Sequence, residues 1–147
     1  MAGEDRYRLA PVRDARARNE QVRRGDLAAA VGDARETQAR LDAARARTQA
    51  ARDAVAAAVA ARDTLIRGAI TPDALVLADR FIARRRGELD RAIGEELRAE
   101  AVHGSQLGSL DEARQRLARA RAEREVIERH FAAWRKTQAK LAERRED

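Results

Sequence analysis

The chain of 147 residues is rich in charge and poor in large apolar side chains: Asp, Glu, Lys and Arg make up 38% of it and aromatic residues only 3%. Much of its 44% hydrophobic content is alanine, which favours a helical coiled coil over a compact globular core. It contains no cysteine, which excludes disulfides and thiolate metal sites, and its formal net charge is +6.

The charge is divided evenly between the two halves of the sequence. Residues 1–66 carry 13 basic and 10 acidic residues, and residues 67–147 carry 18 basic and 15 acidic residues. Nucleic-acid-binding proteins usually gather positive charge in a patch or tail. Here both signs alternate, apart from three arginines at 84–86. An arginine-rich coiled-coil protein that binds nucleic acid is therefore the alternative function and not the preferred one.

We expect a first helix over about residues 8–66. Its heptad seam has twelve positions, nine of them apolar: Leu27, Ala30, Ala34, Thr37, Leu41, Ala44, Thr48, Ala51, Val55, Ala58, Arg62 and Leu65. Further upstream, an apolar stripe continues through Val12, Ala15, Asn19 and Val22. That stripe is one residue out of step, so we expect a slip in heptad phase near Gly25.

A turn is expected at about residues 67–71. Gly68 suits a helix C-terminus because glycine tolerates a left-handed backbone. Thr71 can cap the next helix, and Pro72 fits its first position because proline lacks the N–H group. Asp73 complements the positive end of the helix dipole. These cues together predict one tight reversal of the chain.

The second helix is expected over about residues 72–143, with a heptad seam that never loses phase. The seam positions are Leu75, Ala78, Ile82, Arg85, Leu89, Ala92, Glu96, Ala99, His103, Gln106, Leu110, Ala113, Leu117, Ala120, Arg124, Ile127, Phe131, Trp134, Gln138 and Leu141. Residues 103–109 look locally like a loop, with two glycines. Because the phase is kept across them, we expect a softened or bent helix there and not a break.

The predicted fold is all-α, a long two-helix antiparallel coiled-coil hairpin that forms a single domain over residues 1–147. Folding at the turn pairs residues whose numbers sum to about 140. At ~1.5 Å per residue, the arms would be roughly 90 and 110 Å long. The same pairing places Thr37 and Gln38 level with His103 and Gln106, which predicts a polar layer in the coiled coil.

No motif for catalysis, cofactor binding or metal binding occurs in the sequence. General acid–base chemistry needs a partly desolvated pocket, which a two-helix protein does not form. His103 has no second ligand nearby and is expected to be structural. The longest run of small apolar residues, 54–61, is far shorter than the ~20 residues of a membrane span. We expect a soluble, cytoplasmic, non-enzymatic protein without a cofactor or small-molecule substrate.

Large side chains gather at the two ends of the predicted hairpin. They are Tyr7, Leu9, Phe131 and Trp134 at the open end, and Leu65, Ile66, Ile70, Leu75, Phe81 and Ile82 near the turn. Two interpretations remain open. These residues form the bulkier core layers that hold the helices together, or they contact a partner.

Three segments resemble the FliJ/YscO-type central stalk proteins of flagellar and type III secretion export machines. Residues 7–16 (YRLAPVRDAR) are similar to the opening segment of that family, and residues 78–86 (ADRFIARRR) to its segment after the turn. Residues 125–135 (EVIERHFAAWR) resemble its basic, aromatic C-terminal helix. The family usually has aromatic residues in the distal half of the first helix, and this chain has none between Tyr7 and Phe81.

The resemblance implies a stalk, with the paired termini inserted into the pore of a hexameric export ATPase. The opposite portion would reach the membrane-embedded export gate, export chaperones would also bind, and the protein would associate peripherally with the inner-membrane export apparatus. The ATPase-contact candidates are Arg13, Arg16, Arg129 and Arg135, because a guanidinium matches the geometry of a carboxylate. The gate-contact candidates are Phe81, Arg84 and Arg85. The segment after the turn favours a flagellar system over an injectisome.

Overall fold

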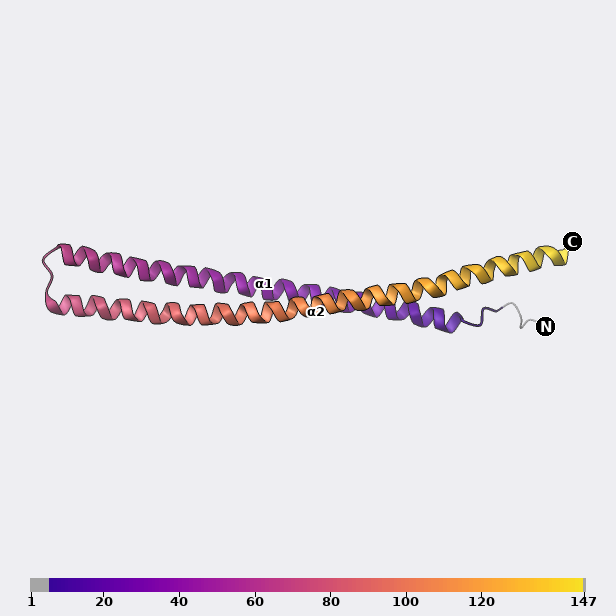
Figure 1. Cartoon of the computed structure of the whole chain (residues 1–147), viewed down its shortest axis with the longest axis horizontal. Coiled ribbons are helices and arrows are strands. Elements are labelled where there is room, and N and C mark those ends of the chain that lie inside the picture. Colours follow the sequence, from indigo (N-terminus) through magenta and orange to yellow (C-terminus); the bar gives the residue numbers. More distant parts are fainter. Residues whose placement is uncertain (1–5, 147) are drawn as a thin grey trace. The chain divides into compact units, whose positions relative to one another are not determined.

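Two long helices make up nearly all of the chain. The computed structural model describes residues 6–146, in which helix α1 spans Ala10–Arg67 and helix α2 spans Pro72–Glu146 (Figure 1). The described residues contain no strand. The fold is therefore all-α, as predicted. The first helix begins two residues later than expected, and the second ends three residues later.

The turn between the helices uses the predicted cap. The Thr71 hydroxyl accepts a hydrogen bond from the N–H of Ala74 at 3.3 Å, and the Thr71 carbonyl accepts one from the N–H of Leu75 at 3.2 Å. The expected left-handed glycine is not present, because no glycine among residues 6–146 has a positive φ. Gly68 instead donates its N–H to the carbonyl of Leu65 at 3.2 Å, which closes the last turn of α1 tightly.

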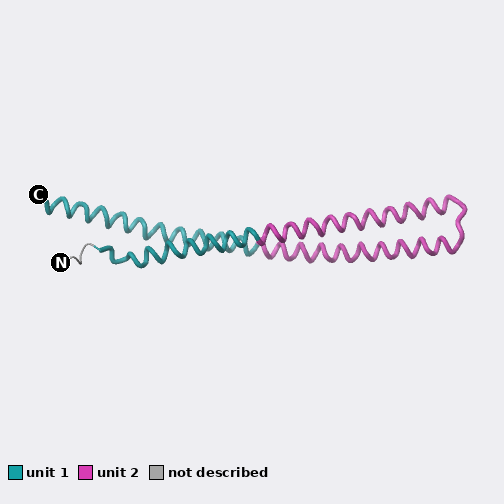
Figure 2. The backbone as a smooth tube through the Cα atoms, turned by 180° about the vertical axis from the view of Figure 1, so that it is seen from behind, with its two compact units in different colours: residues 1–32, 108–147 teal, residues 33–107 magenta. Residues whose placement is uncertain are grey.

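Both helices take part in two compact units (Figure 2). Unit 1 consists of residues 1–32 and 108–147, and unit 2 of residues 33–107. The single hairpin domain over residues 1–147 stays a prediction, and its residues 1–5 and 147 lie outside the part described. The helix pair is described below for each unit separately.

In unit 2 the helices pair antiparallel along the predicted seam. The buried side chains on this seam are Ala34, Leu41, Ala44, Thr48, Ala58 and Ile82. Thr37 Oγ1 lies 2.8 Å from His103 Nδ1, and Thr48 donates a hydrogen bond to the carbonyl of Ala92 at 3.2 Å. In both pairs the residue numbers sum to about 140, which confirms the predicted pairing in unit 2 and the Thr37–His103 contact of the polar layer, whereas Gln38 donates to Asp42 of its own helix.

Alanine and threonine bring the helices of unit 2 close together at Thr48. This side chain is only 1% exposed, and its hydroxyl also donates to the carbonyl of Ala44 at 3.1 Å. One hydroxyl thus bonds to both helices. By contrast, Leu65 and Ile66 near the turn are 45% and 46% exposed, although Ile82, which was grouped with them, is buried at 6%.

Unit 1 shows that the expected slip in heptad phase is wrong. Val12 and Val22 of the proposed stripe are 42% and 57% exposed, whereas Glu20 is only 4% exposed. Glu20 lies one heptad before Leu27, so α1 keeps the same phase and places a carboxylate in the seam. The unbroken seam of α2 explains this, because in a coiled coil one helix keeps its heptad phase when the helix packed against it keeps its own.

The buried residues of unit 1 on α2 are Leu110, Ala113, Leu117, Ala120 and Ile127, all predicted seam positions. Helix α2 is also continuous through residues 103–109, in agreement with the expectation of no break. An added Cβ at Gly104 or Gly108 would meet nothing within 4 Å. Neither glycine is therefore required by close packing.

Candidate interaction surfaces

Unit 1 contains an aromatic end, which we define as Tyr7, His130, Phe131 and Trp134. The Tyr7 ring lies 5.0 Å from Phe131 and 5.2 Å from Trp134 between ring centroids, and its hydroxyl oxygen lies 2.8 Å from His130 Nδ1. Tyr7 is 6% exposed although it precedes α1. Its packing beside α2 makes it a core residue of this unit.

Three of the four ATPase-contact candidates already have carboxylate partners in unit 1. Arg13 donates a hydrogen bond to Glu128 at 2.8 Å, and its guanidinium carbon lies 4.0 Å from the centroid of the Phe131 ring. Arg16 pairs with Glu123, and Arg129 with Glu125. The Arg13 hydrogen bond holds the pKa of Glu128 below its ordinary value, and the same bond raises the pKa of Arg13.

Arg135 differs from those three arginines. Its guanidinium carbon lies 6.0 Å from the Phe131 ring centroid, and no ion pair joins it to a carboxylate of residues 6–146. An external carboxylate can therefore bind Arg135 without breaking an existing ion pair. Of the four candidates, Arg135 is the one that the structure leaves most open to a partner.

A charge cluster around Glu20 was missed in the sequence analysis. Arg124 donates a hydrogen bond to Glu20 at 2.9 Å across the helix pair, Arg24 donates one at 2.5 Å from the same helix, and Arg121 lies 3.8 Å away. The Arg124 hydrogen bond holds the pKa of Glu20 below its ordinary value, and the nearby Arg24 charge adds to this effect. Strict heptad counting back from Leu27 would have found this residue.

The three gate-contact candidates lie together in unit 2. The guanidinium carbons of Arg84 and Arg85 are 5.2 and 4.9 Å from the centroid of the Phe81 ring, within range of a cation–π interaction. Arg85 also donates a hydrogen bond to Glu88 at 2.8 Å, which lowers the pKa of Glu88. Phe81 is 38% exposed. The predicted grouping is thus a half-exposed aromatic ring beside two cations.

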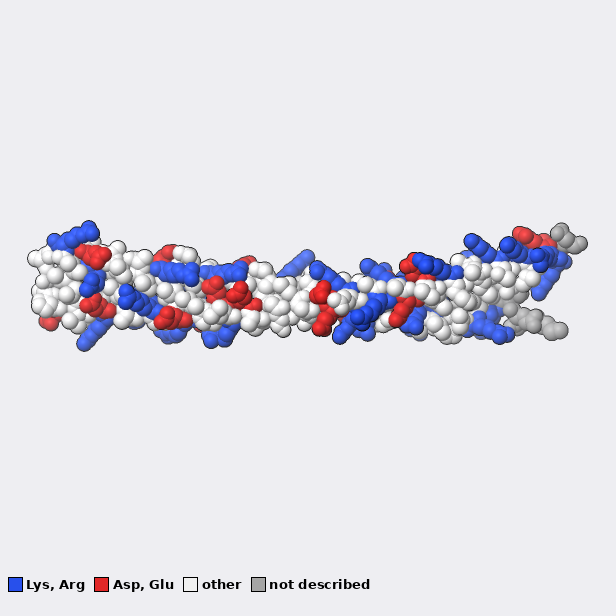
Figure 3. Space-filling view, in the orientation of Figure 1, with Lys and Arg blue, Asp and Glu red and all other residues white. Residues whose placement is uncertain are grey.

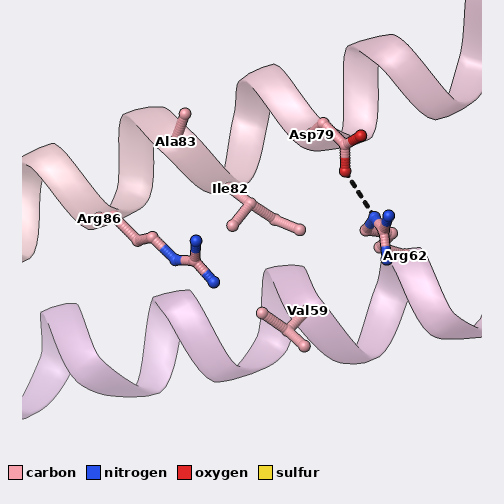
Figure 4. A pocket seen from close by; sticks show the side chains of 6 residues that line it. All are labelled: Val59, Arg62, Asp79, Ile82, Ala83 and Arg86. Atoms are coloured by element: carbon pink, nitrogen blue, oxygen red, sulfur yellow. Dashed lines mark hydrogen bonds and ion pairs between the residues drawn. The ribbon is translucent and has the colours of Figure 1, made fainter.

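A groove in unit 2 was also missed. It is lined by Val59, Arg62, Asp79, Ile82, Ala83 and Arg86 (Figure 4). Arg62 of α1 donates a hydrogen bond to Asp79 of α2 at 2.5 Å, and Arg86 extends from α2 toward α1 beside Ile82. Arg62 occupies a seam position of α1 where an apolar residue would be usual. The guanidinium groups of Arg62 and Arg86 at this groove are suited to bind an acidic side chain.

The fold redistributes the net charge that the sequence halves divide equally. Unit 2 carries 13 basic and 12 acidic residues, a net charge of +1, whereas unit 1 carries 18 basic and 13 acidic residues, a net charge of +5. Lys and Arg side chains line much of the face of unit 1 drawn in Figure 3. The equal charge of the two sequence halves does not carry over to the units, because residues 1–32 and 108–147 belong to the same unit.

The described residues contain neither a metal-binding cluster nor a membrane-spanning segment. Within residues 6–146, no group of three or more His, Cys, Asp or Glu side chains is placed to hold a metal ion. In the same part of the chain, neither helix contains a segment long and apolar enough to cross a membrane.

No family model, curated protein or solved structure matches the chain.

Proposed function

We propose that the chain is a non-enzymatic stalk of a flagellar or type III protein export apparatus. Unit 1 enters the pore of a hexameric export ATPase, and unit 2 links this ATPase to the membrane-embedded export gate. Export chaperones are further partners. The protein acts in the cytoplasm, peripheral to the inner membrane, and needs no cofactor. A flagellar system is favoured by the resemblance of residues 78–86.

One observation supports this proposal most directly: unit 1 combines both ends of the chain with +5 of the net charge of +6. A pore lined by carboxylates would attract this unit over unit 2, whose net charge is only +1. Arg135, which lacks an ion pair within residues 6–146, is the first candidate for such a contact.

The ion pairs on unit 1 are suited to contacts that change during an ATPase cycle. Arg16 and Glu123 are 44% and 47% exposed, and Arg129 and Glu125 are 74% and 63% exposed. Exposed ion pairs of this kind contribute only about 0–1 kcal/mol. Carboxylates of the ATPase ring could therefore replace Glu123 and Glu125 as partners of these arginines at little cost in the stability of unit 1.

For unit 2, the cluster of Phe81, Arg84 and Arg85 supports contact with the export gate. A half-exposed aromatic ring offers apolar area, and the adjacent guanidinium groups select an acidic partner surface. Arg85 is already bonded to Glu88, so Arg84 is the more available cation.

Co-purification with the hexameric export ATPase of the same host tests the proposal. We expect the full chain to bind the ring. The triple change Arg18→Glu, Arg119→Glu and Arg135→Glu should weaken binding roughly tenfold or more through loss of opposite-charge contacts. The control variant reverses Arg35, Arg52 and Arg98 of unit 2 to Glu. These arginines are also exposed, and no ion pair joins them to a carboxylate of residues 6–146. Equal losses in both variants, or no binding by the wild type, would contradict the proposal.

Nucleic-acid binding is a second candidate, favoured by the same gathering of positive charge in unit 1. A chain that binds phosphates loses affinity steeply with salt, with a slope near −0.9 per phosphate contact on duplex DNA. Retention of the protein on duplex DNA at physiological salt, together with no affinity for the ATPase ring, would favour this function over the stalk.

A further inference from the structure

Helix α2 continues past the point where α1 can pair with it. Helix α1 begins at Ala10, whose partner at the observed pairing is near residue 130, and Tyr7 extends the contact as far as Trp134. Helix α2 nevertheless runs on to Glu146, as Figure 1 shows. No described hydrogen bond or ion pair joins residues 136–146 to residues 6–67. We call residues 136–146 the overhang.

The overhang has the chemistry of one side of a helix–helix interface. Leu141 continues the seam seven residues after Trp134 and is 40% exposed. An open groove beside it is lined by Trp134, Gln138, Ala139, Leu141, Ala142 and Arg145. The overhang also carries four cations, at Lys136, Lys140, Arg144 and Arg145, but only two carboxylates, at Glu143 and Glu146.

We propose that the overhang is a docking site for an acidic amphipathic helix of another protein, which would occupy the seam where α1 is absent. The seam of unit 1 is an established helix–helix interface, and Leu141 extends it in phase. The excess of cations selects a partner with Glu or Asp beside its apolar stripe. A second copy fits poorly, because two overhangs would bring like charges together. This site goes beyond the proposed ring contact and does not depend on it.

The chain carries its own reporter for this site. Trp134 is the only tryptophan, and it lines the groove beside Leu141. A helix that covers the groove should shift the emission of Trp134 to shorter wavelength. The experiment titrates the full chain with a synthetic peptide of three heptads, with leucine at the seam positions and glutamate beside them. A scrambled peptide of the same composition is the matched control.

We expect the heptad peptide to bind and the scrambled peptide to bind at least tenfold more weakly. Leu141→Gln should weaken binding of the heptad peptide about tenfold, the effect of losing one buried leucine from an interface. The double change Lys140→Glu and Arg144→Glu should also weaken binding of the heptad peptide. The loss of affinity should be larger at low salt than at high salt, because salt screens the charges. Leu97→Gln is the control, because this leucine is 60% exposed in unit 2 and lies outside the overhang.

Several outcomes would overturn the inference. The first is equal binding of the two peptides, and the second is unchanged binding of the heptad peptide by the Leu141→Gln protein. The third is a shift in Trp134 emission with vesicles of phosphatidylglycerol but with neither peptide. The last outcome would assign the overhang to an anionic lipid surface. Concentration-dependent dimerisation that Leu141→Gln abolishes would assign it to a second copy. None of these measurements uses the export ATPase, so the docking site and the stalk proposal can fail independently.

Discussion

At the scale of single residues, Glu20 is a charged side chain of unit 1 that is nevertheless buried. A carboxylate with only 5% of its side chain exposed would be costly to bury alone. It bonds to Arg124 of α2 and Arg24 of α1, and Arg121 lies near it. Because Arg124 reaches it from the other helix, Glu20 links the two helices at a position where an apolar residue would be usual.

Replacement of Glu20 tests this link. Glu20→Gln should lower the melting temperature at pH 7, because it removes the charge but leaves three arginines around the site. The folded pKa of Glu20 lies below the ordinary value of 4.5, so its stabilising effect is complete above pH 4.5 and is lost as the pH falls through the folded pKa. The difference in melting temperature between wild type and Glu20→Gln should therefore shrink below about pH 4.5.

Glu112→Gln provides the control in the same thermal melts, followed by circular dichroism. Glu112 is 70% exposed and lies 3.9 Å from Arg116, so its loss should change the melting temperature little at any pH. A Glu20→Gln protein that is as stable as wild type at pH 7 would show that the cluster does not hold the helices together.

Thr48 provides a second test at this scale. It is 1% exposed and its hydroxyl bonds to carbonyls of both helices, so a larger side chain has no space there. Thr48→Leu should reduce the free energy of unfolding by about 1–3 kcal/mol, measured by urea denaturation. Thr64→Leu is matched to it, since Thr64 makes the same bond within its own helix but is exposed. Equal effects of the two changes would exclude close packing at Thr48.

At the scale of elements, the seam of α2 was predictable because its apolar residues keep one phase throughout. The pairing of the helices followed from the turn, and with it the contact between Thr37 and His103. At the beginning of α1 the seam position could be counted back from Leu27, but the burial of a carboxylate there was not predictable from an apolar pattern. The apolar residue Val22 is exposed, and the inward position is taken by Glu20. The burial of Glu20 depends on Arg121 and Arg124, which lie more than one hundred residues away in the chain.

The glycines of α2 give a prediction at this scale. Gly104→Ala and Gly108→Ala should each stabilise the protein by about 0.5–1 kcal/mol, because the added methyl groups meet nothing within 4 Å and alanine favours a helix. Gly68→Ala is the control. It lies outside the helices, where its Cβ would be 3.7 Å from the Leu65 carbonyl oxygen, and should give no comparable gain. Urea denaturation compares the three, and a loss of stability at Gly104 or Gly108 would indicate a glycine-dependent distortion.

At the scale of the whole molecule, the important property is the unequal charge of the two units. The chain has a net charge of +6, and its two sequence halves carry equal net charge. Residues 1–32 and 108–147 nevertheless belong to the same unit, unit 1. Counting along the sequence therefore hid the asymmetry. The ion-pair partners of individual arginines could not be predicted either. The sequence offers many carboxylates to each arginine, and only the exact packing of the helices decides which one it reaches.

The most direct measurement of the stalk proposal is crosslinking from each unit to the ATPase ring. The chain has no cysteine, so Val126→Cys in unit 1 and Leu97→Cys in unit 2 can each carry a single benzophenone crosslinker. The two side chains are similarly exposed, at 67% and 60%. The proposal predicts crosslinks to the ring subunits from position 126 and few or none from position 97. Equal yields, or crosslinks from position 97 alone, would contradict it.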